Sequence, residues 1–111
     1  MARYGLIGRR LSHSFSQRYF TGKFARDGLT GHRYDLFELD RIEALPELLS
    51  GTPGLRGLNV TIPHKQTVIP LLHTIDPIAA AVGAVNTIDI REGRLAGYNT
   101  DVDGFRATLA P

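Results

Sequence analysis

The sequence predicts an α/β fold: a three-layer sandwich with a mostly parallel mixed sheet that contains one β-hairpin, and with helices on both faces. Segments of alternating apolar and polar residues, typical of strands, are separated by segments with helical spacing. Strands that alternate with helices form parallel sheets. One pair of strand-like segments, however, is separated only by Arg91-Glu92-Gly93, and such a tight turn makes its two strands antiparallel.

The first part of the chain has the pattern strand, helix, strand. Residues 3–7 and 33–39 have the alternation and the aromatic and aliphatic content of strands. Between them, Ser16 is suited to cap a helix. That helix is expected to end at Asp27-Gly28, because glycine readily adopts the left-handed conformation that follows many helices.

The middle of the chain is expected to form helix, strand and helix. A short turn after Asp40 leads into a helix that starts near Pro46 and ends before Gly51. Residues 57–61 alternate as a third strand. Proline is favoured at the first helical position, so Pro63 predicts a helix over residues 63–73.

The last third begins with a short helix, which Asp76 caps and Gly83 closes. The hairpin follows, with strands over residues 85–90 and 94–98. A final helix is expected to start at Thr100 and to run to about residue 109.

Composition places the chain among soluble globular domains. Its 111 residues, 42% hydrophobic and 22% charged, suffice for one domain but not for two. The chain has no cysteine, which excludes disulfides and thiolate metal sites. Its four histidines lack the paired spacing of metal ligands, so no metal is expected.

The charge pattern and the apolar runs restrict the partners. The net charge is +2 and the basic residues are scattered, so we expect no nucleic-acid partner. The longest apolar run, residues 78–85, is far shorter than the ~20 residues of a membrane span. Because the N-terminus also lacks a signal-peptide pattern, we expect a cytoplasmic protein with no membrane association.

Polar residues gather in four short clusters near the ends of the predicted elements, the region where open α/β sheets bind ligands. Each cluster also has a purely structural explanation as a helix cap, a turn or a solvated strand face. The clusters are Ser12-His13-Ser14-Phe15-Ser16, Asn59-Val60-Thr61 with Lys65, Gly83-Ala84-Val85-Asn86-Thr87, and Asn99-Thr100-Asp101.

A purely structural role accounts least well for the position of Lys65. It falls in the first turn of the helix predicted from residue 63, where the helix dipole disfavours a cation by about 0.3–1 kcal/mol. Either the ammonium group is solvated at little cost, or it has a partner and serves in proton transfer.

In order and spacing, the clusters resemble the N-terminal, substrate-binding domain of the shikimate dehydrogenase family, which includes quinate/shikimate dehydrogenases. The motifs that carry the resemblance are Ser-His-Ser-Phe-Ser, Asn-Val-Thr-Ile-Pro-His-Lys, Gly-Ala-Val-Asn-Thr and Asn-Thr-Asp-x-x-Gly, which span nearly the whole chain. The resemblance implies an oxidoreductase that reversibly reduces 3-dehydroshikimate to shikimate with NADPH, in the pathway to chorismate and the aromatic amino acids.

The resemblance also implies a role for each matching residue. Ser14 and Ser16 would bind the shikimate carboxylate, in agreement with the free N–H groups at a helix N-terminus. Lys65 would be the catalytic lysine, paired with Asp101. Reduction of a ketone leaves an alkoxide, to which the lysine would give a proton, while the carboxylate orients the lysine. The residues that hold the ring hydroxyls would be Asn59, Thr61, Asn86 and Asp101.

Two departures from the family affect these expectations. Gln17, Phe20 and Thr21 stand where the family usually has Pro, His and Asn, so the carboxylate site would rest on a differently built helix. The family also continues into a second domain that binds NADP, whereas here no G-x-G-x-x-G follows a strand. We therefore expect residues 1–111 to be an isolated substrate-binding domain that binds shikimate weakly and is inactive alone.

Two other interpretations remain open. The chain could be a stand-alone binding module for shikimate or quinate without catalysis, or one component of an enzyme assembled from two chains. The pattern is compatible with shikimate or quinate as ligand, with NADP or NAD as cofactor, and with any oligomeric state.

Overall fold

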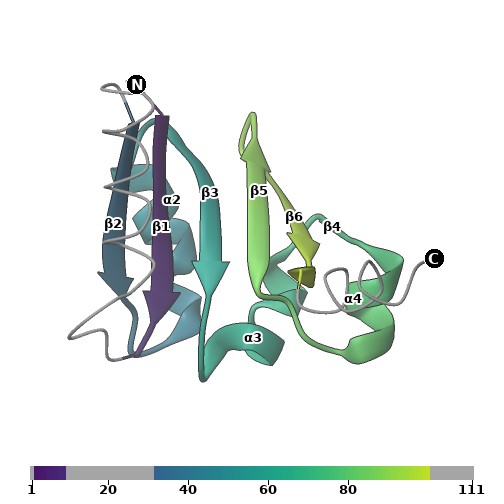
Figure 1. The fold of residues 1–111 in the computed structure, drawn as a ribbon. Coiled ribbons are helices and arrows are strands. Elements are labelled where there is room, and N and C mark those ends of the chain that lie inside the picture. The colour runs from purple at the N-terminus through teal and green to yellow at the C-terminus, as the bar shows by residue number, and fades with distance from the viewer. Residues whose placement is uncertain (1, 10–31, 101–111) are drawn as a thin grey trace.

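The computed structural model describes residues 2–9 and 32–100, which form one six-stranded mixed sheet in the order β2-β1-β3-β5-β6-β4 (Figure 1). Strands β1 and β2, β1 and β3, and β4 and β6 pair in parallel, whereas β5 is antiparallel to β3 and β6. The predicted fold class, a mostly parallel mixed sheet with one hairpin, is confirmed. The strands are β1 (Ala2–Gly8), β2 (His32–Glu38), β3 (Leu55–Val60), β4 (Thr74–Ile75), β5 (Thr87–Arg91) and β6 (Arg94–Tyr98).

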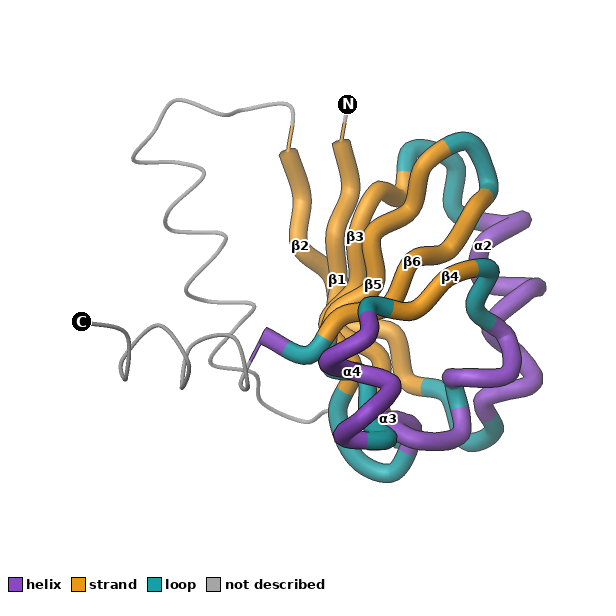
Figure 2. Tube along the Cα trace, turned by 90° about the vertical axis from the view of Figure 1, so that its right-hand side faces the viewer, coloured by secondary structure: helices purple, strands orange, loops and turns teal. Residues whose placement is uncertain are grey.

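The described helices are short. Helix α2 lies behind strands β1 to β3 in Figure 1 and to their right in Figure 2, so it covers one face of this half of the sheet. The helix predicted over residues 16–27 lies outside the described residues, and of the helix predicted from Thr100 to about residue 109 only Thr100 is described, in helical conformation. The helical elements are η1 (Ile42–Ala44), α2 (Leu45–Gly51), α3 (His64–Thr67), η2 (Ile69–Leu71) and α4 (Pro77–Val82), where η marks a 3₁₀ turn.

The core lies between the sheet and the helical layer. Leu58 and Val60 of β3 point into it, and Asn59 between them points to the opposite face, because successive strand residues alternate. Each fully buried aliphatic side chain contributes about 1.5–3 kcal/mol through removal from water. The largest fully buried side chains are Ile7, Leu45, Val68, Val85 and Ile88.

The prediction of one helix over residues 63–73 is wrong. Only His64–Thr67 is α-helical, and a 3₁₀ turn and strand β4 follow. Pro70 has no N–H to donate to the preceding turn, which ends a helix. The backbone N–H of His73 instead donates to the Leu95 carbonyl at 2.9 Å, which draws the chain to β6.

The local end signals of the later elements are confirmed. The Asp76 carboxylate accepts a hydrogen bond from the Ile78 N–H at 3.1 Å and so caps α4. Gly83 ends that helix in the left-handed conformation, with φ of 78°. Glu92 and Gly93 both have positive φ, 52° and 78°, as the two-residue turn of a hairpin requires.

The other boundaries shift by a few residues. The predicted strand 57–61 is observed as Leu55–Val60, and the first hairpin strand is Thr87–Arg91 rather than residues 85–90. The short turn before α2 is the 3₁₀ turn η1, and Pro46 lies in the first turn of α2, close to the predicted start.

Candidate functional site

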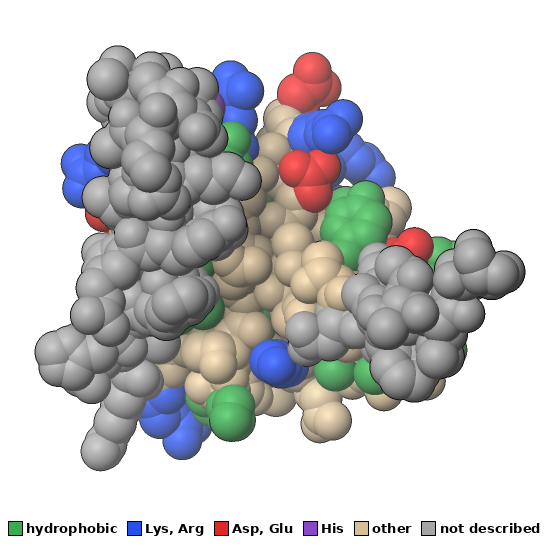
Figure 3. Space-filling model, viewed as in Figure 1, with side chains coloured by type: hydrophobic (Ala, Val, Ile, Leu, Met, Phe, Trp, Pro, Cys, Tyr) green, Lys and Arg blue, Asp and Glu red, His purple; other side chains and the backbone are tan. Residues whose placement is uncertain are grey.

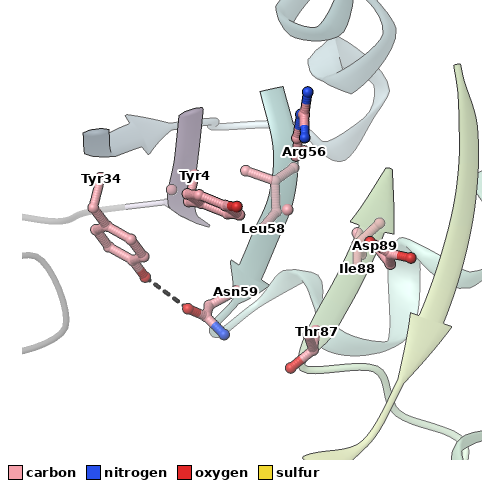
Figure 4. Close-up of a pocket in the computed structure, with 10 residues that line it drawn as sticks. Tyr4, Tyr34, Arg56, Leu58, Asn59, Thr87, Ile88 and Asp89 are labelled. Carbon is pink, nitrogen blue, oxygen red and sulfur yellow. Dashed lines mark hydrogen bonds between the residues drawn. The ribbon is translucent and has the colours of Figure 1, made fainter. Parts of the chain in front are cut away.

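A hollow of about 350 Å³ opens beside strands β3 and β5, on the sheet face that carries Asn59 (Figure 4). Gly57 lies beside Tyr4 in the strand register, and a Cβ at residue 57 would lie 3.1 Å from Cδ1 of the tyrosine ring. The missing side chain of Gly57 therefore makes room for Tyr4. The polar and aromatic side chains that line the hollow are Tyr4, Tyr34, Arg56, Asn59, Thr87 and Asp89.

Asn59 is held in this hollow by a tyrosine. The Tyr34 hydroxyl donates a hydrogen bond to Asn59 Oδ1 at 2.8 Å, and Tyr34 is only 5% exposed. Figure 4 shows the Asn59 amide nitrogen pointing away from Tyr34. Asn59 therefore offers N–H groups, rather than its carbonyl oxygen, to a molecule in the hollow.

Backbone hydrogen bonds join the cluster around Lys65 to the cluster around Asn86. The Val60 N–H donates to the Asn86 carbonyl at 2.8 Å, and the Val85 N–H donates to the Lys65 carbonyl at 2.8 Å. Asn59 also pairs with Thr87 in the antiparallel register of β3 and β5. The two clusters, whose nearest residues are 18 positions apart in the sequence, therefore lie side by side.

The Asn86 side chain joins its own cluster to the last one. Its Oδ1 accepts hydrogen bonds from the Thr87 hydroxyl at 3.0 Å, from the Thr100 N–H at 3.0 Å and from the Thr100 hydroxyl at 3.2 Å. Because a backbone N–H can only donate, its partner must be the amide oxygen. Asn86, like Asn59, is thus left with its N–H groups for a ligand.

The predicted site residues stand in three different situations. Asn59 lines the hollow, and Asn86 is the neighbour of Thr87, which also lines it. Thr61 and Lys65 are half-buried and do not line it. The structure therefore brings the three later clusters together, through backbone hydrogen bonds and through the Asn86 side chain. Ser14, Ser16 and Asp101 lie outside the described residues.

The helix-dipole argument for Lys65 loses its basis. Helix α3 has only four residues, and Lys65 lies in its last turn as much as in its first, so few peptide dipoles are aligned behind it. Within residues 2–9 and 32–100, no carboxylate forms an ion pair with Lys65. Any charged partner for this ammonium must come from elsewhere.

Red and blue side chains in Figure 3 are most numerous at the end of the sheet that carries the β5–β6 turn, and separate blue side chains lie toward the opposite end. Near the turn, Arg91 Nε lies 2.9 Å from Asp89 Oδ2. The centre of the face is largely uncharged.

His64 is a residue whose role the sequence pattern did not reveal. Its side chain is buried, at 3% exposure, and its Nε2 lies 2.6 Å from the Leu39 carbonyl oxygen. A carbonyl only accepts, so the imidazole donates. The bond ties α3, and with it Lys65, to the end of β2. The only signal in the sequence is that His64 directly precedes Lys65.

The described residues do not fit a dinucleotide or a metal. The three described turns that lead from a strand into a helical element, after β2, β3 and β4, contain no glycine, whereas a dinucleotide fold uses glycines at such a turn for close approach of the pyrophosphate. Within the same ranges, no group of His, Asp or Glu could hold a metal ion. No described helix has the length and apolar content of a membrane span.

Comparisons with known proteins show the family of this chain. A family model described as "Shikimate dehydrogenase substrate binding domain" matches residues 6–88. An NADP(+) shikimate dehydrogenase from Chlorobaculum tepidum is 43% identical over 110 residues, which cover 97% of this chain. Because those residues are 37% of that relative, the chain spans little more than a third of its length.

Solved structures show the same relationship. Shikimate dehydrogenase 1 from Peptoclostridium difficile superposes with a TM-score of 0.86 at 37% identity, and the match covers 98% of this chain and 41% of the other. The shikimate 5-dehydrogenase from Thermus thermophilus, solved in complex with NADP(H) and shikimate, superposes with a TM-score of 0.83 at 34% identity. That match covers 100% of this chain and 44% of the other.

Proposed function

Because this chain belongs to the shikimate dehydrogenase family, we propose that it is the part of such an enzyme that binds shikimate and 3-dehydroshikimate. The observation that carries the proposal is the convergence of three polar clusters, held together by the hydrogen bonds of Lys65, Asn86 and Thr100. A small hydroxylated ring offers many oxygens that accept hydrogen bonds, and the two asparagines face outward with N–H groups. In this proposal, the protein acts in the cytoplasm.

In this proposal, Asn59, Thr61 and Asn86 bind the ring oxygens, and Ser14 and Ser16 bind the carboxylate. Asp101 follows Thr100, whose N–H is bonded to Asn86, and the residue before Asn86 is bonded to the Lys65 carbonyl. This chain of contacts favours a pair between Lys65 and Asp101. The lysine would then exchange a proton with the reacting substrate oxygen while Asp101 orients it.

NADP(H) would supply the redox chemistry of the whole enzyme, as the names of the relatives indicate. Since the described residues do not fit a dinucleotide, we propose that residues 1–111 alone bind the substrate without converting it. Affinity is expected to be low, because closure of a second domain over the substrate contributes to binding in enzymes of this kind.

Titration of the isotope-labelled chain with shikimate, followed by NMR, tests the binding proposal. We expect shikimate to move the backbone amide signals of Ser14, Lys65, Asn86 and Asp101. Quinate serves as a second ligand, and cyclohexanecarboxylate, an acid without hydroxyls, as the control. If all three acids move the same signals equally, or if shikimate moves none of them, the proposed function is wrong.

An absorbance assay tests the proposal that the chain alone is inactive. The chain is mixed with NADPH and 3-dehydroshikimate, and nicotinamide absorbance is followed. No loss above that of a protein-free sample is expected. Enzymatic turnover by the 111-residue chain would refute this part of the proposal and leave the binding proposal intact.

A further inference from the structure

We propose that Tyr34 is a positioning residue, whose hydroxyl fixes the Asn59 amide so that Asn59 meets a ligand only as a hydrogen-bond donor. The inference rests on the proposed function for the identity of the ligand. The hydrogen bond between Tyr34 and Asn59 is present in the chain without a ligand, so this part of the inference can be tested without one. The two residues are 25 positions apart, on strands β2 and β3, which are not neighbours in the sheet.

The orientation of the Asn59 amide turns its nitrogen, rather than its oxygen, away from Tyr34. Its Oδ1 points to the Tyr34 hydroxyl, which donates to it at 2.8 Å, and its Nδ2 points away from Tyr34 (Figure 4). Within the described part of the chain, its Nδ2 donates no hydrogen bond. An amide can exchange the places of its oxygen and nitrogen by a half-turn about χ2. A phenol hydroxyl can also accept a hydrogen bond from the amide nitrogen, so the proposed role requires that the Tyr34 hydroxyl acts as the donor, as it does in this structure.

Asn86 provides an independent comparison within the same site. Its amide oxygen receives three hydrogen bonds, one from a backbone N–H. That orientation cannot be reversed without placing two donors against each other. Among residues 2–9 and 32–100, no backbone N–H donates to the Asn59 oxygen, and the tyrosine hydroxyl is its donor. Both asparagines then present N–H groups to the ligand.

Two fixed donors have a consequence for ligand choice. A ketone oxygen only accepts hydrogen bonds, whereas a hydroxyl both donates and accepts. A site that presents donors can hold the oxidised and the reduced form of the same ring oxygen in one geometry. It rejects ligands that carry an ammonium or amide N–H at these positions, because two donors would then meet.

The burial of Tyr34 also suits this role. The ring is 5% exposed and sits on a strand, so its hydroxyl has little freedom to move. Removal of the hydroxyl alone, in Tyr34→Phe, keeps the apolar ring and its packing. The variant therefore separates the hydrogen bond from the hydrophobic contribution of the side chain.

The first experiment follows the side-chain amide signals of Asn59 by NMR in the free chain. Tyr34→Phe is expected to shift and broaden them, because both amide orientations become populated. The same removal of a hydroxyl in Tyr4→Phe, also in the hollow, is the control and is expected to change them much less. If Tyr34→Phe leaves the Asn59 signals in place, the inference is wrong, whatever the ligand.

The second experiment measures the shikimate dissociation constant. Tyr34→Phe is expected to weaken binding about two- to tenfold, the effect of one lost orienting hydrogen bond. Asn59→Asp keeps an acceptor for the tyrosine but cannot donate, and is expected to weaken binding at least as much. In an Asn59→Ala background, Tyr34→Phe should have no further effect.

The outcomes separate the two proposals. If the unmodified chain does not bind shikimate, the proposed function fails, and the Asn59 signals still decide the positioning role. If the chain binds and Tyr34→Phe weakens binding equally in the unmodified chain and in the Asn59→Ala background, Tyr34 acts independently of Asn59. The inference would then be refuted and the proposed function would stand.

Discussion

Asn86 and Thr100 are 14 positions apart, and Oδ1 of Asn86 accepts both the backbone N–H and the hydroxyl of Thr100, at 3.0 and 3.2 Å. This contact joins the end of strand β6 to the residue that precedes strand β5. It holds the start of the last polar cluster beside the middle ones. The side chain of Asn86 thus has a structural task on its oxygen and a proposed ligand-binding task on its nitrogen.

Two substitutions of Asn86 should separate these tasks. Asn86→Asp keeps an acceptor for Thr100 but loses the donors, so the fold should be retained and shikimate binding lost. Asn86→Leu removes both, and should lower the free energy of unfolding by about 0.5–1.5 kcal/mol, since Thr100 is exposed and water can replace part of the contact. Urea unfolding and an NMR titration measure the two effects. Equal destabilisation by both variants would contradict the structural task.

Lys65→Gln is expected to weaken shikimate binding without changing stability. The loss of a charged hydrogen bond to the ligand corresponds to about 1.5–3 kcal/mol, tenfold or more in the dissociation constant. Because Lys65 is half-buried and has no ion-pair partner among the described residues, the free energy of unfolding should change by less than about 0.5 kcal/mol.

The control for Lys65 is Arg41→Gln, which removes one positive charge from an exposed residue outside the hollow. It should leave shikimate binding unchanged. If both variants weaken binding to the same degree, the effect comes from the net charge of the chain, and Lys65 has no specific contact with the ligand.

His64→Leu should destabilise the chain, because the buried Leu39 carbonyl would lose its donor at 2.6 Å. An unsatisfied buried acceptor costs about 1–3 kcal/mol. His64→Gln places an amide N–H near the position of the imidazole Nε2 and should recover part of that loss. Thermal and urea unfolding of the two variants give the comparison, and equal stability of both would show that the hydrogen bond contributes nothing.

Gly5→Ala is expected to destabilise the sheet by about 1–3 kcal/mol through overpacking. A Cβ at residue 5 would clash with the Phe37 ring and would lie 2.7 Å from the Asp35 carbonyl oxygen. The backbone atom cannot move aside as a flexible side chain could. The matched control is Gly51→Ala at the end of α2, where a Cβ meets nothing within 4 Å.

Chemical denaturation of the two glycine variants decides this prediction. Gly51→Ala should be neutral or should stabilise by up to about 1 kcal/mol, because alanine loses less backbone entropy on folding than glycine. Equal effects of the two substitutions would mean that the close approach of β1 to Phe37 does not prevent a side chain at residue 5.

The sequence alone correctly predicted the elements whose ends are determined by residues close to one another in the chain. The cap of α4 needs only Asp76 and Gly83, seven positions apart, and the hairpin turn needs only Glu92-Gly93. In each case the residues that decide the structure contact one another within a few positions. The helix predicted over residues 63–73 failed because Pro70 interrupts it and because His73, at its end, bonds to Leu95 of β6, more than twenty positions away.

By itself, the sequence determined the fold class, the order of the strands and helices along the chain, and the four polar clusters with their family resemblance. These depend on periodicity, turn residues and short motifs, all of which are local. Only the tertiary structure decided that Tyr34 orients Asn59, that His64 holds α3 to β2, and that Asn86 gives its oxygen to Thr100. Each of these is a directional bond between distant segments, so it forms only after the sheet has brought its strands into register.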